Sequence, residues 1–177
     1  MNAGAEKYSR IVYERRFLVA PRADWKQFVE PYSKTYEDKY LKDARLRLRV
    51  LTDSDSSRQL IKLTKKFESD SPYFQMISTI ILSPLEYQIF DTLEGNRLEK
   101  IRYYHHYGKR IFSIDVFENE LDGLVLCETE SGGLEDLLSV APPAYVSREV
   151  TEDAFFTGGH LCRATNADLL HKLSDFA

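Results

Sequence analysis

Alternation of charged and apolar residues runs along much of the chain and predicts β-strands. In DARLRLRV, residues 43–50, Arg45, Arg47 and Arg49 occupy every second position, and apolar residues fill the gaps. Successive side chains of a strand point to opposite faces, so one face of this strand is cationic and the other apolar. Similar patterns predict strands at about 10–19, 33–41, 44–51, 58–66, 73–82, 97–107, 110–118 and 124–130.

Helices are expected at fewer places. Ser83, Pro84 and Glu86 form a capping-box start for a helix at 83–93, GLEDLLSV predicts a short one at 133–140, and an amphipathic helix is expected at about 165–175. Residues 1–8 read as a loose tail. Many strands with few helices favour an α+β protein, mainly β, built as a closed or nearly closed antiparallel sheet. We expect a single domain spanning 1–177, with its core at about 8–162.

The period of two gathers the charges of each predicted strand on one face. The groups that share a face are Val12 with Glu14 and Arg16, Ile61 with Leu63 and Lys65, Lys100 with Arg102, Ser113 with Asp115 and Phe117, and Glu128 with Glu130. The opposite face of most of these strands is apolar, as at Leu46 and Leu48. An apolar face needs cover, so we expect helices packed outside the sheet and the charged faces turned toward a lumen.

Such a lumen needs a ligand. An unpaired buried charge costs on the order of several kcal/mol, so like charges are not gathered inside a protein without partners. Guanidinium and ammonium groups pair well with phosphate oxygens, and Mg²⁺ favours one or two carboxylates together with phosphate oxygens and water. The pattern alone therefore predicts a polyphosphate that is held by Arg and Lys and bridged to Glu by a metal ion.

Composition narrows the alternatives. A formal net charge of -4 and a pI near 5.6 argue against a general nucleic-acid binder. The two cysteines, Cys127 and Cys162, provide neither a disulfide framework nor a four-thiolate zinc site, which favours a cytoplasmic protein. We find no long apolar run or apolar leader, and therefore expect no membrane partner.

Seven short motifs in order carry a resemblance to a known family. YERRFLV, RLRLR, KLTK, EKIRY, IDVF, LCETE and REVTED resemble those of the CYTH superfamily, the triphosphate tunnel metalloenzymes, over about residues 8–162. The resemblance implies a tunnel of about eight antiparallel strands with helices outside. It also implies activity on a triphosphate with Mg²⁺ or Mn²⁺, as in the inorganic and thiamine triphosphatases, the class IV adenylate cyclases and the RNA triphosphatases.

Carried over to this sequence, the resemblance and the strand pattern assign a role to each candidate residue. The metal ligands are predicted to be Glu14, Glu128 and Glu130. The predicted triphosphate-binding residues are Arg16, Arg45, Arg47, Arg49, Lys65, Lys100 and Arg102. Asp115 is predicted to support catalysis, or alternatively to be a fold-stabilising ion partner of Arg102. Arg45 is equally well explained as a structural surface residue.

Two departures from the family pattern leave the function open. Val12 stands where the N-terminal signature has its first Glu, and the segment SPYFQMISTIIL lacks the second acidic pair that many members carry. We expect metal-dependent hydrolysis of a small-molecule triphosphate by a monomer or homodimer. The alternatives are a class IV-type adenylate cyclase and a non-catalytic polyphosphate- or nucleotide-binding protein.

Overall fold

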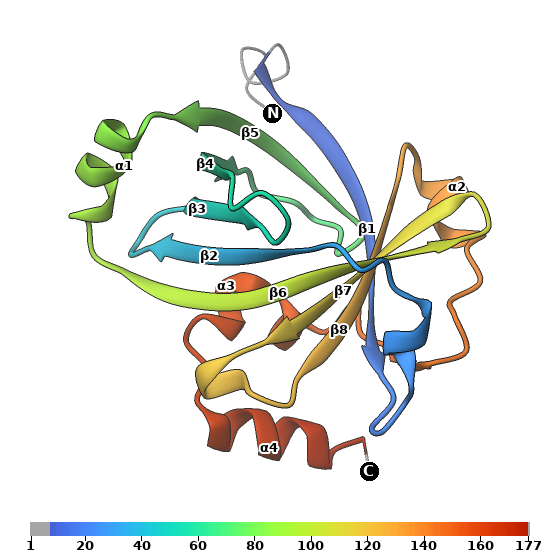
Figure 1. Cartoon of the computed structure of the whole chain (residues 1–177). Coiled ribbons are helices and arrows are strands. Elements are labelled where there is room, and N and C mark those ends of the chain that lie inside the picture. The colour runs from blue at the N-terminus through green and yellow to red at the C-terminus, as the bar shows by residue number, and fades with distance from the viewer. Residues whose placement is uncertain (1–7, 177) are drawn as a thin grey trace.

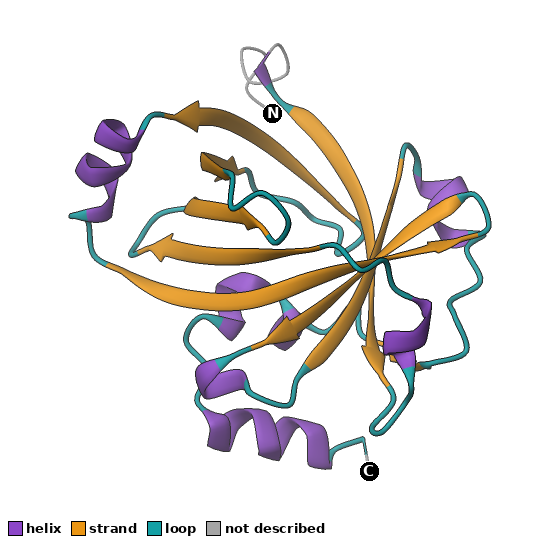
Figure 2. Cartoon of the chain, in the orientation of Figure 1, coloured by secondary structure: helices purple, strands orange, loops and turns teal. Residues whose placement is uncertain are grey.

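The structure, a computed structural model, describes residues 8–176, so most of the predicted N-terminal tail lies outside the described residues. The strands are β1 (Arg10–Val19), β2 (Ser33–Leu41), β3 (Leu46–Asp53), β4 (Gln59–Lys66), β5 (Phe74–Leu82), β6 (Gly95–Tyr107), β7 (Arg110–Phe117), β8 (Val125–Ser131) and β9 (Val146–Glu149). The helices are α1 (Pro84–Asp91), α2 (Leu134–Leu138), α3 (Gly158–Leu161) and α4 (Asn166–Ser174), with 3₁₀ turns η2 (Trp25–Phe28), η3 (Asn119–Leu121) and η4 (Ala154–Phe156). Figure 2 shows how far strands outweigh helices.

The sheet closes on itself, which confirms the predicted antiparallel barrel. Its strands follow the order β5-β4-β3-β2-β6-β7-β8-β1, and β1 pairs with β5 as well as with β8. The ladder between β1 and β5 joins Arg10 to Ile77 and Tyr13 to Phe74. Eight strands thus form the wall, and β9 is added beside the second half of β1. This short ninth strand was not predicted.

Apolar clusters cover the outside of the barrel, as the sequence predicts. Leu48 and Leu63 pack with Tyr87 and Phe90 of α1. A second outer cluster joins strands β1, β7 and β8 to η2 and to the segment after α2; its buried members are Phe17, Val19, Trp25, Phe112, Ile114, Cys127, Val140 and Tyr145. Figure 1 shows α1 and α2 at opposite sides of the wall. The clusters therefore fix which face of each strand turns inward.

A third apolar cluster fills one end of the barrel interior. Leu98 of β6 and Leu126 of β8 pack with Phe156, Leu161 and Leu169 from the C-terminal segment. Figure 1 shows α3 and α4 beneath β6, β7 and β8, where they cover this end. Helix α4 begins at the expected place with a Thr165–Asp168 capping box. No helix within residues 8–176 is long and apolar enough to cross a lipid bilayer.

Candidate functional site

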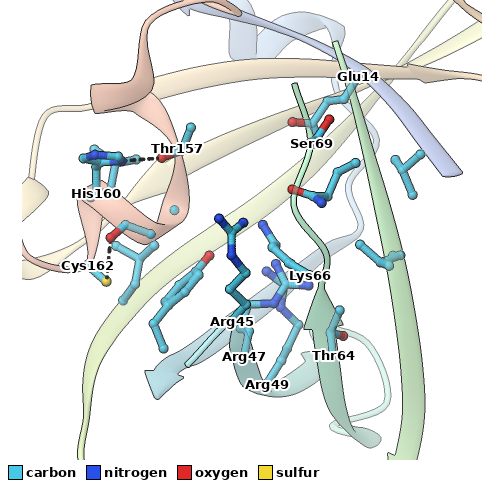
Figure 3. A pocket seen from close by; sticks show the side chains of 18 of the residues that line it. Glu14, Arg45, Arg47, Arg49, Thr64, Lys66, Ser69, Thr157, His160 and Cys162 are labelled. Atoms are coloured by element: carbon cyan, nitrogen blue, oxygen red, sulfur yellow. Dashed lines mark hydrogen bonds between the residues drawn. The ribbon is translucent and has the colours of Figure 1, made fainter. Parts of the chain in front are cut away.

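A cavity of about 1770 Å³ lies inside the barrel and is lined by charged side chains of β1, β3, β4, β6 and β8. Pockets for small ligands commonly measure about 300–1,000 Å³, so this space is large enough for a small-molecule ligand. In Figure 3 the side chains of Arg45, Arg47, Arg49 and Lys66 lie grouped together, and Glu14 lies apart from them. The charged lumen expected from strand alternation is therefore present.

The three arginines around strand β3 have different surroundings. Arg49 donates to both oxygens of Asp38 on β2, with a distance of 2.6 Å from Nη2 to Oδ2. Asp38 is almost fully buried, and although burial raises its pKa, Arg49 and Arg47 lower it to about 2. Arg45 precedes the strand, keeps half of its side chain exposed and pairs with Glu68 at 3.4 Å, which fits the surface alternative.

Asp115 organises a second ion-paired group on β6 and β7. It is fully buried, receives two hydrogen bonds of 2.6 Å from Arg102 and also contacts Lys100. Arg102 also donates a hydrogen bond from Nη2 to Oε2 of Glu128 on β8, at 2.6 Å. Lys100, Arg102 and Glu128 line the cavity, and Asp115 lies behind them. The alternative that Asp115 is an ion partner of Arg102 agrees with this geometry.

Strands β1 and β8 place Arg16 between two carboxylates. The register sets Arg16 opposite Glu128, and Glu14 opposite Glu130. Arg16 donates from Nε to Glu128 at 3.0 Å and from Nη2 to Glu14. Burial opposes the charge of Arg16, but the two carboxylates outweigh it and raise its pKa. Burial also opposes the charge of Glu128, whose pKa is nevertheless held well below its usual range by Lys100, Arg102 and Arg16.

Basic side chains with weak ion pairs or none line the side of the cavity formed by β3 and β4. Among the described residues, Arg47 Nε is the one buried side-chain nitrogen or oxygen without a hydrogen bond, and it lies 3.9 Å from Asp38. Neither the Lys62 nor the Lys66 side chain forms an ion pair or hydrogen bond within residues 8–176. Burial, followed by repulsion from Arg47, lowers the pKa of Lys66 to about 8. We call Arg47, Lys62 and Lys66 the open basic wall.

The position of Lys66 corrects the prediction for Lys65. Lys65 is exposed and lies at the edge of the cavity. It shares the outward face of β4 with Leu63, which packs in the cluster beside α1. Thr64 faces inward and bonds to Thr79 of β5 at 3.0 Å. Strand alternation therefore gives the inward positions to Lys62 and Lys66. The prediction correctly placed Lys65 on the same face as Leu63. That face turns outward, whereas the prediction had it facing the lumen.

Glu130 differs from the other predicted acidic residues of the site. It lines the cavity, and its side chain has no hydrogen bond or ion pair among the described residues. Partial burial of its carboxyl and the nearby negative charges of Glu14 and Glu128 raise its pKa. Glu130 is thus a carboxylate with an increased affinity for a proton.

The predicted metal ligands do not form a ready cation site. Within residues 8–176 no group of three or more His, Cys, Asp or Glu side chains gathers closely enough to hold a metal ion. Glu14 and Glu128 are joined instead by the Arg16 guanidinium. Val12 lies on the same inner face and adds no oxygen. The residues present therefore do not fit a resident Mg²⁺ or Mn²⁺ ion held by Glu14, Glu128 and Glu130.

Three inner residues escaped the sequence analysis: Asp38, Lys62 and Lys66. Asp38 lies on β2, whose sequence SKTYEDKYL carries charges on both faces and gives no clear alternation. Lys62 and Lys66 share a face with Thr64 on β4. The spacing 62, 64, 66 was a usable signal, because the opposite face carries the apolar Ile61 and Leu63.

Comparison with known proteins gives matches in structure only. No protein-family model matches the sequence, and no curated protein matches it significantly. A crystal structure of the hypothetical protein NE1496 is similar at 24% identity and a TM-score of 0.57, over 87% of this chain and 99% of that chain. A structure described as the inorganic triphosphatase NE1496 is 23% identical with a TM-score of 0.56, over 86% and 95%.

A third similar structure comes from Hippeastrum. It is described as the putative adenylyl cyclase HpAC1, which reveals a dominant triphosphatase activity. It shares 12% identity and a TM-score of 0.50, over 72% of this chain and 82% of that chain. These likenesses show a common fold. The chain therefore shares the closed barrel fold of these structures.

Proposed function

We propose that the protein binds the triphosphate group of a small molecule in its cavity and hydrolyses the terminal phosphoanhydride bond. The open basic wall carries this proposal. A buried guanidinium nitrogen without a partner and a buried lysine among arginines are costly in the free protein, and phosphate oxygens satisfy both. Guanidinium groups match phosphate oxygens in geometry as well as charge.

The basic residues of the open basic wall and those held by buried aspartates have different roles in the proposed reaction. Arg47, Lys62 and Lys66 are free to bind phosphate oxygens. Arg49 and Arg102 are already held in place by Asp38 and Asp115. Donors fixed before the reaction stabilise developing charge without reorganisation, so these held arginines neutralise charge on the leaving phosphates as the bond breaks.

Glu130 supplies the remaining group that hydrolysis needs. Its carboxylate lines the cavity without an ion partner, and its raised pKa makes it a better proton acceptor. In the proposed step a water oxygen bonds to the terminal phosphorus, the bridging P–O bond breaks, and Glu130 accepts the water proton. The shortened phosphate leaves with its charge neutralised by the arginines.

The expected Mg²⁺ or Mn²⁺ stays a prediction, and the proposal assigns no residue to hold a resident cation. The cytoplasmic location, the absence of nucleic-acid and membrane partners, and the monomer or homodimer also stay predictions. A second candidate function is binding of a polyphosphate or nucleotide without turnover. It is favoured by Val12 and by the engagement of Glu14 and Glu128 with Arg16.

One experiment separates these functions. The purified protein is incubated with tripolyphosphate, ATP or thiamine triphosphate, each with EDTA, Mg²⁺ or Mn²⁺, and phosphate and cyclic AMP are measured. Hydrolysis predicts phosphate release that falls in Lys66→Ala and persists in Lys65→Ala. Calorimetric binding without product identifies the second candidate, and cyclic AMP identifies the cyclase alternative. Absence of both binding and product for all three compounds contradicts the proposal.

A further inference from the structure

Arg16 occupies the space between two of the three carboxylates that the sequence predicts as metal ligands. Its Nε lies 3.0 Å from Glu128 Oε1, and its Nη2 contacts Glu14. The register explains the bridge, because Arg16 lies opposite Glu128 on β8 and two residues from Glu14 on the same face of β1. The Arg16 side chain keeps 15% of its area exposed, so the contact lies largely away from solvent.

The shape of the side chain matters as much as its charge. A guanidinium is planar, keeps its charge, and presents donors in a fixed fork that reaches two carboxylates at once. A lysine in the same position offers a single nitrogen. Val12, next along the inner face, leaves the carboxylates without a further acidic neighbour on β1. The local charge is therefore balanced by the chain itself.

We propose that Arg16 takes the place of a resident divalent cation, so that a triphosphate binds in this cavity without a metal ion. This inference rests on the proposed function for the identity of the ligand. Carboxylates beside a phosphate repel it unless a positive charge neutralises them. Arg16 neutralises Glu14 and Glu128, and Arg102 adds a second bond to Glu128 at 2.6 Å.

A neighbouring ion pair provides a matched control. Arg15 lies on the outer face of β1 and holds Glu149 with two hydrogen bonds, one of 2.9 Å from Nε and one of 2.6 Å from Nη2. It is one residue from Arg16, belongs to the same strand and does not line the cavity. If Arg16 were only a structural pair, replacement of either arginine would affect stability and leave metal binding unchanged.

The first test titrates the ligand-free chain with Mn²⁺ and follows the free-ion signal by electron paramagnetic resonance. The wild-type protein and Arg15→Ala are expected to show no saturable binding. Arg16→Ala releases Glu14 and the Oε1 atom of Glu128 beside Glu130, and is expected to bind one Mn²⁺ per chain. Saturable binding by the wild type, or no gain in a folded Arg16→Ala protein, overturns the inference.

The second test keeps the positive charge and covers the case in which Arg16→Ala does not fold. Calorimetry measures tripolyphosphate binding to the wild type, Arg16→Lys and Arg15→Lys in EDTA and in Mg²⁺. The wild type and Arg15→Lys are expected to bind equally well in both. Arg16→Lys loses one charge-assisted contact, and is expected to bind about tenfold more weakly in EDTA and to recover in Mg²⁺. A wild type that binds only with Mg²⁺, or an Arg16→Lys protein that behaves like Arg15→Lys, overturns the inference.

The two tests also separate this inference from the proposed function. If no protein binds tripolyphosphate under either condition, the triphosphate function fails. The Mn²⁺ titration still decides whether Arg16 blocks a cation site. If tripolyphosphate binds only with Mg²⁺, the function stands and the role of Arg16 is wrong.

Discussion

Two sides of the same cavity use basic residues in opposite ways. On β6 and β7, Arg102 and Lys100 are neutralised by the fully buried Asp115. On β3 and β4, the open basic wall is balanced less completely: Arg47 shares Asp38 with Arg49 and its Nε lacks a hydrogen bond, and Lys66 has no ion partner in the described part of the chain. Arginine and lysine are thus held in ion pairs on the β6–β7 side of the cavity, and are left with unused donors on the β3–β4 side.

The difference teaches how function can be read from charge balance. Removing one member of a buried ion pair leaves the other member unpaired, which is strongly destabilising. Removing a basic residue that is already unpaired relieves repulsion in the free protein. Substitutions on the paired side should therefore reduce stability, and those in the open basic wall should reduce binding.

The largest effect is expected for Asp115→Asn. The change leaves Lys100 without its buried counter-charge and Arg102 with Glu128 alone, and the free energy of unfolding should fall by about 3–5 kcal/mol. Urea unfolding measures this loss. The exposed Lys42–Glu94 pair is the control, because Glu94→Gln should change the same quantity by less than about 1 kcal/mol. Equal small losses in both variants would show that the Asp115 group does not support the fold.

The next effect concerns binding to the open basic wall. Arg47→Ala and Lys66→Ala each remove a charge-assisted phosphate contact, and should weaken tripolyphosphate binding by about 1.5–3 kcal/mol. Ligand-free Lys66→Ala should be as stable as the wild type or more stable, because an unpaired charge is lost, and Arg47→Ala should lose little stability, because Arg49 still pairs with Asp38. Calorimetry and urea unfolding check the two parts. Lys65→Ala is the matched control, and an equal loss of affinity there would refute the inward assignment of Lys66.

A pH dependence follows from Lys66. Its pKa of about 8 in the folded chain lies below the ordinary 10.5, so the unfolded chain binds more protons between these values. The free energy of unfolding should therefore gain from this residue as pH rises through that window. Triphosphate favours the charged lysine, so its binding should take up a proton above about pH 8 and weaken as pH increases.

Calorimetry in buffers of different ionisation enthalpy measures this proton uptake. Lys66→Arg is the control, because a guanidinium stays charged throughout the range and the ligand's own ionisation is common to both proteins. The uptake should be smaller in Lys66→Arg than in the wild type. An unchanged uptake would assign the proton to the ligand alone.

The smallest effect is expected at Arg45. Its side chain is half exposed and pairs with the exposed Glu68, and such surface pairs contribute about 0–1 kcal/mol. Arg45→Ala should leave stability within that range and reduce tripolyphosphate affinity less than Arg47→Ala does. Parallel titrations of the two variants measure the difference. A larger loss for Arg45→Ala would place the ligand at the cavity rim.

Local alternation was enough to predict the barrel, the inward direction of Arg47 and Arg49, and the acidic face of β8. On β4 the wrong face was predicted to turn inward, because Lys65 is a charged residue on the face of Leu63. The polar face is formed by Lys62, Thr64 and Lys66. The apolar cluster beside α1 contains Leu63, so the face of β4 that carries Leu63 turns outward. A residue's ion partner depends on the order of strands in the sheet: Asp38 meets Arg49 only because β2 pairs with β3. Single-strand patterns carry no such information.

The central claim, that the open basic wall is the triphosphate site, is tested most directly by ligand-induced stabilisation. A ligand that binds only the folded state raises the free energy of unfolding. Urea unfolding is measured with and without tripolyphosphate for the wild type, for Lys65→Ala and for the double variant Arg47→Ala/Lys66→Ala. Tripolyphosphate should stabilise the first two proteins and have little effect on the double variant, which should itself be folded. Equal stabilisation of all three proteins would contradict the account.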